Sequence, residues 1–146
     1  MKKILSVAVL GSTGYVGLEL VKILIRHPNI QIKFLGCENS PSKDIREFDQ
    51  NIVIDTLPKL DLNNNFDPKN YDLVFLSLPH GVSHKFVKNF NRKIKIIDLS
   101  ADFRLDSEKL YSKNYNNDHA CPELLNQFIY GLPEINKDVL NTNFDV

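Results

Sequence analysis

A glycine-rich turn near the start of the chain constrains the fold more than any other stretch. An apolar run over residues 4–10 leads into G-S-T-G-Y-V-G, and apolar residues at helical spacing follow over 18–26. A strand, a glycine turn and a helix in this order are typical of a phosphate-binding βα unit. Glycine lets the backbone turn sharply, and the start of a helix presents unpaired N–H groups and a positive dipole end to an anion.

The spacing of the glycines differs from the commoner dinucleotide pattern, so it is weak evidence for the identity of the ligand. Gly11, Gly14 and Gly17 form G-x-x-G-x-x-G, whereas the commoner dinucleotide pattern is G-x-G-x-x-G, and Thr13 stands in place of its second glycine. The turn predicts a pyrophosphate site because a strand precedes it and a helix follows it. A turn that needs glycine only for packing stays an alternative.

Composition excludes several kinds of partner. The 146 residues are 42% hydrophobic, which is enough for one domain with a core, and 18 basic residues balance 18 acidic ones. We therefore expect no nucleic-acid partner and no membrane partner. The two cysteines form no metal or disulfide pattern, and the short apolar run after Met1 has no cleavage pattern, so we expect no metal site and a cytoplasmic protein.

Apolar runs along the rest of the chain alternate between strands and helices. Strands are predicted over 30–37, 73–78 and 94–99, and helices over 18–26 and 82–90. Shorter helices are expected from Asp106 or Ser107 to 115, from Pro122, and from Ile135 or Asn136 to about 140. Residues 44–68 suggest one or two irregular short strands, and 143–146 suggest the start of another. The pattern predicts an α/β fold with a doubly wound, mostly parallel sheet of the Rossmann type, a single dinucleotide-binding domain over 1–146.

The residues after the second strand should meet the adenine ribose of a dinucleotide. Glu38 could accept a hydrogen bond from the ribose 2′-OH of NAD and would repel the 2′-phosphate of NADP. Ser40, Ser42 and Lys43 could instead accommodate that phosphate. The residues alone leave the choice of cofactor open, and a surface loop without a binding role is a third possibility.

Polar groups follow two later strands, at the sheet edge where such folds bind ligands. Pro79, His80 and Gly81 follow one strand, and His80 could hydrogen-bond a ligand. Ser100, Asp102 and Arg104 follow the next, and the planar guanidinium suits a phosphate or carboxylate. The alternative is a local salt bridge between Asp102 and Arg104. His84 is expected on the surface of its helix, and Cys121 is not expected to act as an activated thiol.

Five motifs occur in order along the whole chain: G-S-T-G-Y-V-G at 11–17, L-P-H-G-V-S at 78–83, D-L-S-A-D-F-R-L at 98–105, P-E-L-L at 122–125 and Y-G-L-P-E at 130–134. Together they resemble N-acetyl-gamma-glutamyl-phosphate reductases. The histidine-glycine loop combined with the S-A-D-F-R block separates this resemblance from the related aspartate-semialdehyde dehydrogenases, which share the architecture.

The resemblance implies NADPH-dependent reduction of an N-acetylglutamyl acyl phosphate to the semialdehyde, with release of phosphate, in arginine biosynthesis. The cofactor would be NADP, with NAD not excluded, and the substrate a small acyl phosphate. Residues implied to hold the pyrophosphate are Ser12, Thr13, Gly14, Tyr15 and Val16. Pro79, His80 and Gly81 would lie beside the ribose and nicotinamide, and Ser100 and Arg104 near the acyl phosphate.

The resemblance also implies a cysteine nucleophile in an Asn-Pro-Gly-Cys motif that is expected beyond Val146. We therefore expect no catalytic residue in this chain and no substrate-binding, dimer-forming domain. The chain alone is expected to be inactive, and a homo-oligomer is expected only for the full-length protein. A stand-alone nucleotide-binding or regulatory module of the same fold is the alternative.

Overall fold

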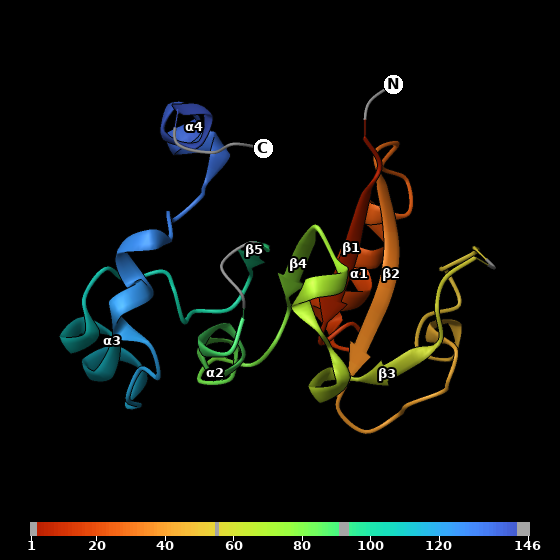
Figure 1. The fold of residues 1–146 in the computed structure, drawn as a ribbon, viewed down its shortest axis with the longest axis horizontal. Helices are drawn as coiled ribbons and strands as arrows, with labels where there is room; N and C mark the ends of the chain where they lie inside the picture. Colours follow the sequence, from red (N-terminus) through yellow and green to blue (C-terminus); the bar gives the residue numbers. More distant parts are fainter. Residues whose placement is uncertain (1–2, 55, 91–93, 143–146) are drawn as a thin grey trace.

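A parallel β-sheet forms the centre of the molecule (Figure 1). The structure is a computed structural model that describes residues 3–54, 56–90 and 94–142. The strands of this five-stranded sheet run in the order β3-β2-β1-β4-β5, and every paired strand is parallel to its neighbour. Their bounds are Leu5–Leu10 for β1, Ile30–Cys37 for β2, Leu60–Leu62 for β3, Leu73–Leu76 for β4 and Lys95–Asp98 for β5. The predicted α/β fold with a doubly wound sheet is confirmed.

Helices and short 3₁₀ turns connect the strands. The α-helices are α1 (Tyr15–Leu24), α2 (Ser83–Lys88), α3 (Glu108–Tyr115) and α4 (Pro133–Thr142). The 3₁₀ turns are η1 (Ile45–Glu47), η2 (Asn63–Asn65), η3 (Pro68–Asn70) and η4 (Pro122–Gln127). Ser107 caps α3 by accepting the N–H of Leu110, and Asn136 interrupts the regular helical backbone of α4.

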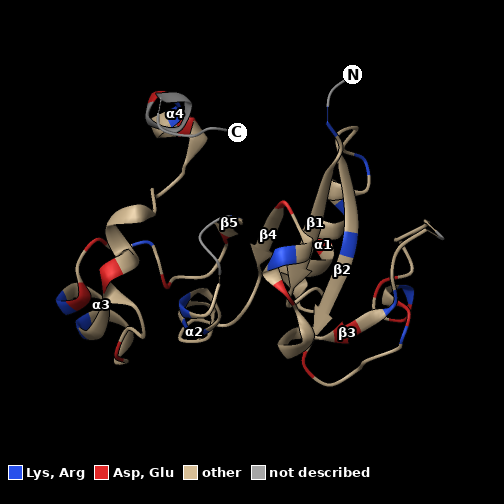
Figure 2. Cartoon of the chain, viewed as in Figure 1, with Lys and Arg blue, Asp and Glu red and all other residues tan. Residues whose placement is uncertain are grey.

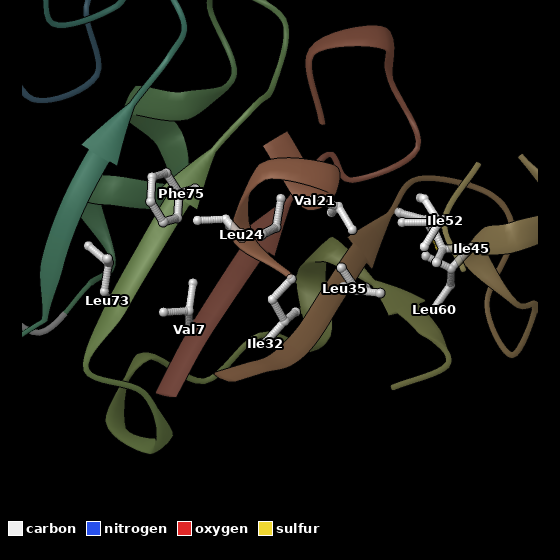
Figure 3. Packing of buried hydrophobic residues seen from close by; sticks show 12 residues of the cluster. Val7, Val21, Leu24, Ile32, Leu35, Ile45, Ile52, Leu60, Leu73 and Phe75 are labelled. Carbon is white, nitrogen blue, oxygen red and sulfur yellow. The ribbon is translucent and has the colours of Figure 1, made fainter. Parts of the chain in front are cut away.

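Strand β4 and most of β1 are buried on both faces of the sheet, and each face has its own apolar cluster. Val7 and Val9 point to one face, where they pack with Val21 and Leu24 of α1 (Figure 3). The opposite face of β1 packs with α2 and η4 through a second cluster, which contains Ala8, Leu10, Val74, Leu76, Val87 and Leu125. Strands covered on both faces read as continuous apolar runs, which explains why β1 and β4 were predictable.

The connections leave β1 in two directions and so create a switch point. The chain passes from β1 through α1 to β2 on one side, and β4 then pairs with the other side of β1. Because such crossovers are right-handed, α1 and α2 cover opposite faces. The loops that follow β1 and β4 meet at this switch point, which is the usual ligand position in open α/β sheets.

Several predicted elements differ from the observed ones. Helix α1 begins at Tyr15 rather than at residue 18. The apolar pattern did not reveal its first turn, because Tyr15 and Val16 are exposed and do not contribute to the apolar stripe. Residues 44–68 contain one described strand, β3, two 3₁₀ turns, η1 and η2, and the first residue of η3. The helix predicted from Pro122 is the 3₁₀ turn η4. The strand suggested at 143–146 lies outside the described residues.

Gly17 is buried in the first turn of α1, where the helix touches the backbone of the turn before it. A Cβ atom at this position would lie 2.3 Å from the Gly11 carbonyl oxygen and 2.8 Å from the Ser12 Cα. Both atoms belong to the backbone and cannot rotate away. The third glycine is therefore required for helix α1 to approach the end of β1.

We expect Gly17→Ala to lower the free energy of unfolding by about 2 kcal/mol or more, because overpacking against backbone atoms forces α1 away from the sheet. Urea denaturation followed by circular dichroism measures this loss. Gly14→Ala is the matched control, since a Cβ there would meet only the Gly11 carbonyl oxygen, at an ordinary 3.6 Å. Equal stability of the two variants would contradict this packing argument.

Candidate functional site

The glycine turn after β1 lies against the start of the loop after β4. Gly11 has a φ of +75°, which favours glycine, and a Cβ there would lie 2.2 Å from the Ser77 carbonyl oxygen. The Ser77 N–H in turn donates to the Leu10 carbonyl at 2.9 Å. The Gly11 N–H donates to Oδ1 of Asn63 at 3.0 Å. The two loops therefore meet at the switch point of the sheet.

Ser12 fastens the same turn to the end of β2. Its N–H and its hydroxyl both donate to the Gly36 carbonyl, at 2.8 Å and 2.9 Å, and the residue is fully buried. A pyrophosphate contact by Ser12 stays a prediction. The observed geometry favours a role in shaping the turn, because both donors of Ser12 are directed at Gly36.

The outer side of the turn is open. Gly14 is exposed and occupies the N-cap position of α1, with extended backbone. Tyr15 and Val16 are exposed as well, and the N–H groups in the first turn of a helix have no carbonyl one turn earlier to bind. Within the described part of the chain no side chain caps this end and no acidic residue lies in its first turn. The N-terminus of α1 can therefore receive an anion.

The loop after β4 carries the second group of predicted site residues. Pro79 and His80 are exposed, whereas Gly81 is buried. The Gly81 N–H donates to Oδ1 of Asp102 at 2.7 Å. The His80 ring lies 5.9 Å from the Tyr115 ring, centroid to centroid. Pro79 and His80 therefore face solvent, while a hydrogen bond to Asp102 holds Gly81 in place.

The loop after β2 is closed by backbone hydrogen bonds. Glu38 is exposed and Ser40 is half-buried. Ser42 donates its N–H to the Leu60 carbonyl at 2.7 Å, and the Leu60 N–H donates to the Lys43 carbonyl at 2.9 Å. Residues 38–43 therefore form a compact loop beside the edge strand β3, at the same edge of the sheet as the glycine turn.

The segment after β5 places the two predicted substrate residues differently. Ser100 is buried, its hydroxyl donates to Oδ2 of Asp98 at 2.8 Å, and it accepts the Asp102 N–H at 3.1 Å. Burial raises the pKa of Asp98 above its ordinary value. A substrate contact by Ser100 stays a prediction, although its hydroxyl is already engaged on both sides.

Arg104 is exposed at the same strand end. Its Nε donates to the Ser100 carbonyl at 2.9 Å and its Nη2 donates to the Leu99 carbonyl at 3.2 Å. The guanidinium is thus held by backbone carbonyls while Asp102 points into the interior, so the local salt bridge considered from the sequence is wrong.

A pocket of about 290 Å³ adjoins Arg104, with Phe103, Leu105, Asp106, Leu125, Phe128 and Tyr130 as its other lining residues.

A buried polar cluster behind the β4 and β5 loops was not predicted from the sequence. It consists of His84, Asp102, Tyr111, His119 and Cys121, all at most 5% exposed. The expectation that His84 faces solvent is wrong: His84 precedes the buried Val87 by three residues, which places both on the buried side of α2. That spacing was the available signal.

Hydrogen bonds determine the tautomer of both buried histidines. Nδ1 of His84 accepts the Ala120 N–H, and Nδ1 of His119 accepts the Cys121 N–H at 3.3 Å, so each neutral ring carries its proton on Nε2. Nε2 of His119 then donates to the Asp102 carbonyl at 3.0 Å. Burial, together with the neighbouring His84, lowers the pKa of His119 below its ordinary 6.5.

Cys121 is inert in this cluster. Its thiol donates to the His84 carbonyl at 3.3 Å, and burial raises its pKa to about 11. A catalytic thiol needs a lowered pKa and an accessible sulfur. The expectation that Cys121 is not an activated nucleophile therefore agrees with its surroundings.

We expect the free energy of unfolding to fall as the pH is lowered from 7 to 5. Over this range the unfolded chain takes up a proton at His119 before the folded chain does, because the folded pKa is depressed, so acid favours unfolding. His119→Gln keeps an N–H donor but binds no proton, and its urea stability should depend less on pH. Asp98 titrates in both proteins and cancels in the comparison. Identical pH dependence would exclude His119 as the cause.

Charge is spread over the chain rather than sorted onto one element. Figure 2 shows basic and acidic positions interspersed, with both signs on α3. Over residues 3–54, 56–90 and 94–142, no helix has the length and apolar character needed to cross a membrane. In that same part of the chain, no three His, Cys, Asp or Glu side chains come together as metal ligands would. A small anion would have to be held by local N–H groups and individual side chains.

Comparison with known proteins identifies the relatives of this chain. A family model described as "Semialdehyde dehydrogenase, NAD binding domain" matches residues 6–143. The N-acetyl-gamma-glutamyl-phosphate reductase of Ehrlichia chaffeensis is 42% identical over 89% of this chain and 38% of its own length. That of Acinetobacter baylyi is 37% identical over 94% of this chain and 40% of its own length. The chain thus spans about two-fifths of the length of these curated relatives.

Solved structures share the architecture. Aspartate semialdehyde dehydrogenase from Candida albicans, crystallised with NADP, aligns with a TM-score of 0.58 at 23% identity, over 73% of this chain and 32% of that one. Aspartate semialdehyde dehydrogenase II from Vibrio cholerae aligns with a TM-score of 0.59 at 20% identity, over 73% and 34%. These alignments concern the fold, while the reductase sequences match nearly the whole chain. The chain belongs to the family that this model describes, the NAD-binding domain of semialdehyde dehydrogenases, and it is similar over most of its length to N-acetyl-gamma-glutamyl-phosphate reductases.

Proposed function

We propose that this chain binds NADP(H) across the carboxyl edge of its sheet, with the pyrophosphate on the turn formed by residues 11–17. The observation that carries the proposal is the open N-terminus of α1 at the switch point between β1 and β4. Backbone N–H groups and the helix dipole favour a diphosphate there. Thr13, Gly14, Tyr15 and Val16 would provide the contacts, while Gly11, Ser12 and Gly17 hold the turn in shape.

The space over Gly14 supports this assignment. Packing does not require a glycine at this position, because a Cβ would meet only the Gly11 carbonyl oxygen, at 3.6 Å. Gly11 and Gly17, by contrast, are both required by backbone contacts closer than 2.5 Å. A glycine that packing does not need leaves room for a ligand to approach the backbone.

Residues 38–43 would receive the adenine ribose. Ser40 is half-buried in this loop and can donate its hydroxyl to a 2′-phosphate, which favours NADP. Glu38 lies directly after β2, where a carboxylate can accept from a ribose hydroxyl. The proposal therefore takes NADP as the cofactor, with binding of NAD as the outcome that a direct comparison can reveal.

The nicotinamide end would extend toward the loop after β4. Pro79, His80 and Gly81 would line the ribose and the ring, and the bound cofactor would supply the hydride. Arg104, held by two backbone carbonyls, would direct its remaining N–H groups toward the acyl phosphate or the departing phosphate. Ser100 would contribute by holding Asp98 and Asp102 in place around that site.

The reaction we infer for the whole enzyme is reduction of N-acetyl-L-glutamyl 5-phosphate to its semialdehyde, with release of phosphate, in arginine biosynthesis. The enzyme would act in the cytoplasm and as a homo-oligomer. Cys37 and Cys121 are both buried, so we propose that neither supplies the thiolate that attacks the acyl phosphate. This chain would be the dinucleotide-binding part of the reductase.

We expect Gly14→Val to abolish NADPH binding while the melting temperature stays within about 3 °C of the unchanged chain, because a Cβ at this position meets only the Gly11 carbonyl oxygen, at 3.6 Å, and the branched side chain would enter the space over the turn. Titration by the fluorescence of the reduced nicotinamide measures binding. If the unchanged, folded chain shows no saturable binding of NADPH or NADH, the proposed function is wrong.

We expect Ser40→Asp to weaken NADPH binding about tenfold by charge repulsion and to leave NADH binding nearly unchanged, because NADH lacks the 2′-phosphate. Parallel titrations with the two cofactors measure the ratio of their dissociation constants. Ser40→Asn is the matched control, since asparagine has the size of aspartate without its charge and should weaken NADPH binding less than Ser40→Asp does. Equal weakening of both cofactors by Ser40→Asp would place the 2′-phosphate elsewhere.

A further inference from the structure

We propose that Asp102 is a positioning residue, which fixes the 79–81 loop so that it can receive the nicotinamide end of the cofactor. The inference rests on the proposed function, because it concerns the same site. Asp102 lies after β5 and is fully buried, so it cannot touch the ligand itself. Its action would pass through the backbone of the loop after β4.

Both oxygens of the Asp102 carboxylate hold the β4 loop and the start of α2. Oδ1 accepts the Gly81 N–H at 2.7 Å, and Oδ2 accepts the His84 N–H at 3.1 Å. The Tyr111 hydroxyl donates to Oδ1 at 2.9 Å. One carboxylate thus binds two backbone donors three residues apart, which fixes both the position of the loop and its direction into α2.

The charge of Asp102 is balanced by these donors. A buried carboxylate is costly unless hydrogen bonds satisfy it, and here two backbone N–H groups and a hydroxyl do so. Nε2 of His84, which carries the ring proton, lies 4.0 Å from Oδ2 and makes no hydrogen bond with it. An amide in place of the carboxylate has only one accepting oxygen, so it cannot receive both backbone donors.

The backbone of Asp102 is itself anchored. Its N–H donates to the Ser100 hydroxyl at 3.1 Å, and its carbonyl accepts from Nε2 of His119 at 3.0 Å. The carboxylate therefore cannot follow the loop if the loop moves. Since Gly81 has a φ of +78°, the loop also adopts a backbone conformation that other residues resist.

This arrangement connects the two halves of the proposed site. The loop with His80 and the segment with Arg104 come from different strands, and Asp102 lies two residues before Arg104. Fixing Gly81 to Asp102 therefore sets the distance between the groups expected at the nicotinamide and those expected at the acyl phosphate. From the sequence, Asp102 was considered only as a salt-bridge partner of Arg104 and not as a residue that positions the loop.

The test compares Asp102→Asn with Tyr111→Phe in this 146-residue chain. Both substitutions remove a hydrogen bond of the same buried carboxylate, but Tyr111→Phe leaves both carboxylate oxygens available to the Gly81 and His84 N–H groups. Each protein is titrated with NADPH and with 2′,5′-ADP, a fragment that carries the adenine end without the nicotinamide. Near-UV circular dichroism and urea denaturation establish that each protein is folded.

We expect Asp102→Asn to weaken NADPH binding about tenfold, with 2′,5′-ADP binding within twofold of the unchanged chain. Tyr111→Phe should leave both affinities within twofold. Equal losses for NADPH and 2′,5′-ADP in Asp102→Asn would mean a general loosening of the domain and would overturn the proposal. Unchanged affinity for both would overturn it as well.

A second variant keeps the proposal testable if Asp102→Asn does not fold. Gly81→Ala leaves the carboxylate in place and forces the same loop out of its positive φ, so it should also weaken NADPH binding and spare 2′,5′-ADP. Unchanged NADPH binding by a folded Gly81→Ala chain would overturn the proposal. If the unchanged chain binds neither ligand, the proposed function fails, and this inference with it.

Discussion

The close approach of the turn backbone to two strand ends determines the geometry of the whole candidate site. Gly11 lies against the Ser77 carbonyl after β4, and Ser12 directs two donors at the Gly36 carbonyl near the end of β2. No residue larger than glycine fits at position 11, and none fits at position 17, where α1 meets the turn. These contacts place the N-terminus of α1 over the switch point, so the position of the proposed anion site follows from the packing of the sheet.

Internal hydrogen bonds, rather than exposed side chains, shape both halves of the site. The residues whose polar groups bond within the protein, such as Ser12, Ser100 and Asp102, define where the loops lie. The groups left facing outward are backbone N–H groups, His80 and Arg104. This division between inward and outward groups would let the proposed site bind anionic groups although the protein as a whole has no net charge.

The sequence was informative where one local pattern decides the structure. Apolar runs predicted β1 and β4, and alternating apolar residues predicted β2. These strands and β5 were placed within two residues at either end, and the glycine spacing predicted the turn. It was less informative where partners lie far apart in the chain. The burial of His84 depends on Asp102 and Ala120, and the engagement of Ser12 depends on Gly36, pairings that only the folded sheet creates. The predicted ligand contacts themselves stay predictions.

The central position of β1 has a consequence for the order of folding. This strand is made first, yet it pairs with residues 30–35 on one side and with residues 73–76 on the other. Long-range parallel pairing of this kind is slow, because the chain loses the entropy of a long loop before the strand contacts stabilise it. A nascent chain that has not reached β4 carries an apolar strand with one side unpaired, a segment on which chaperones act.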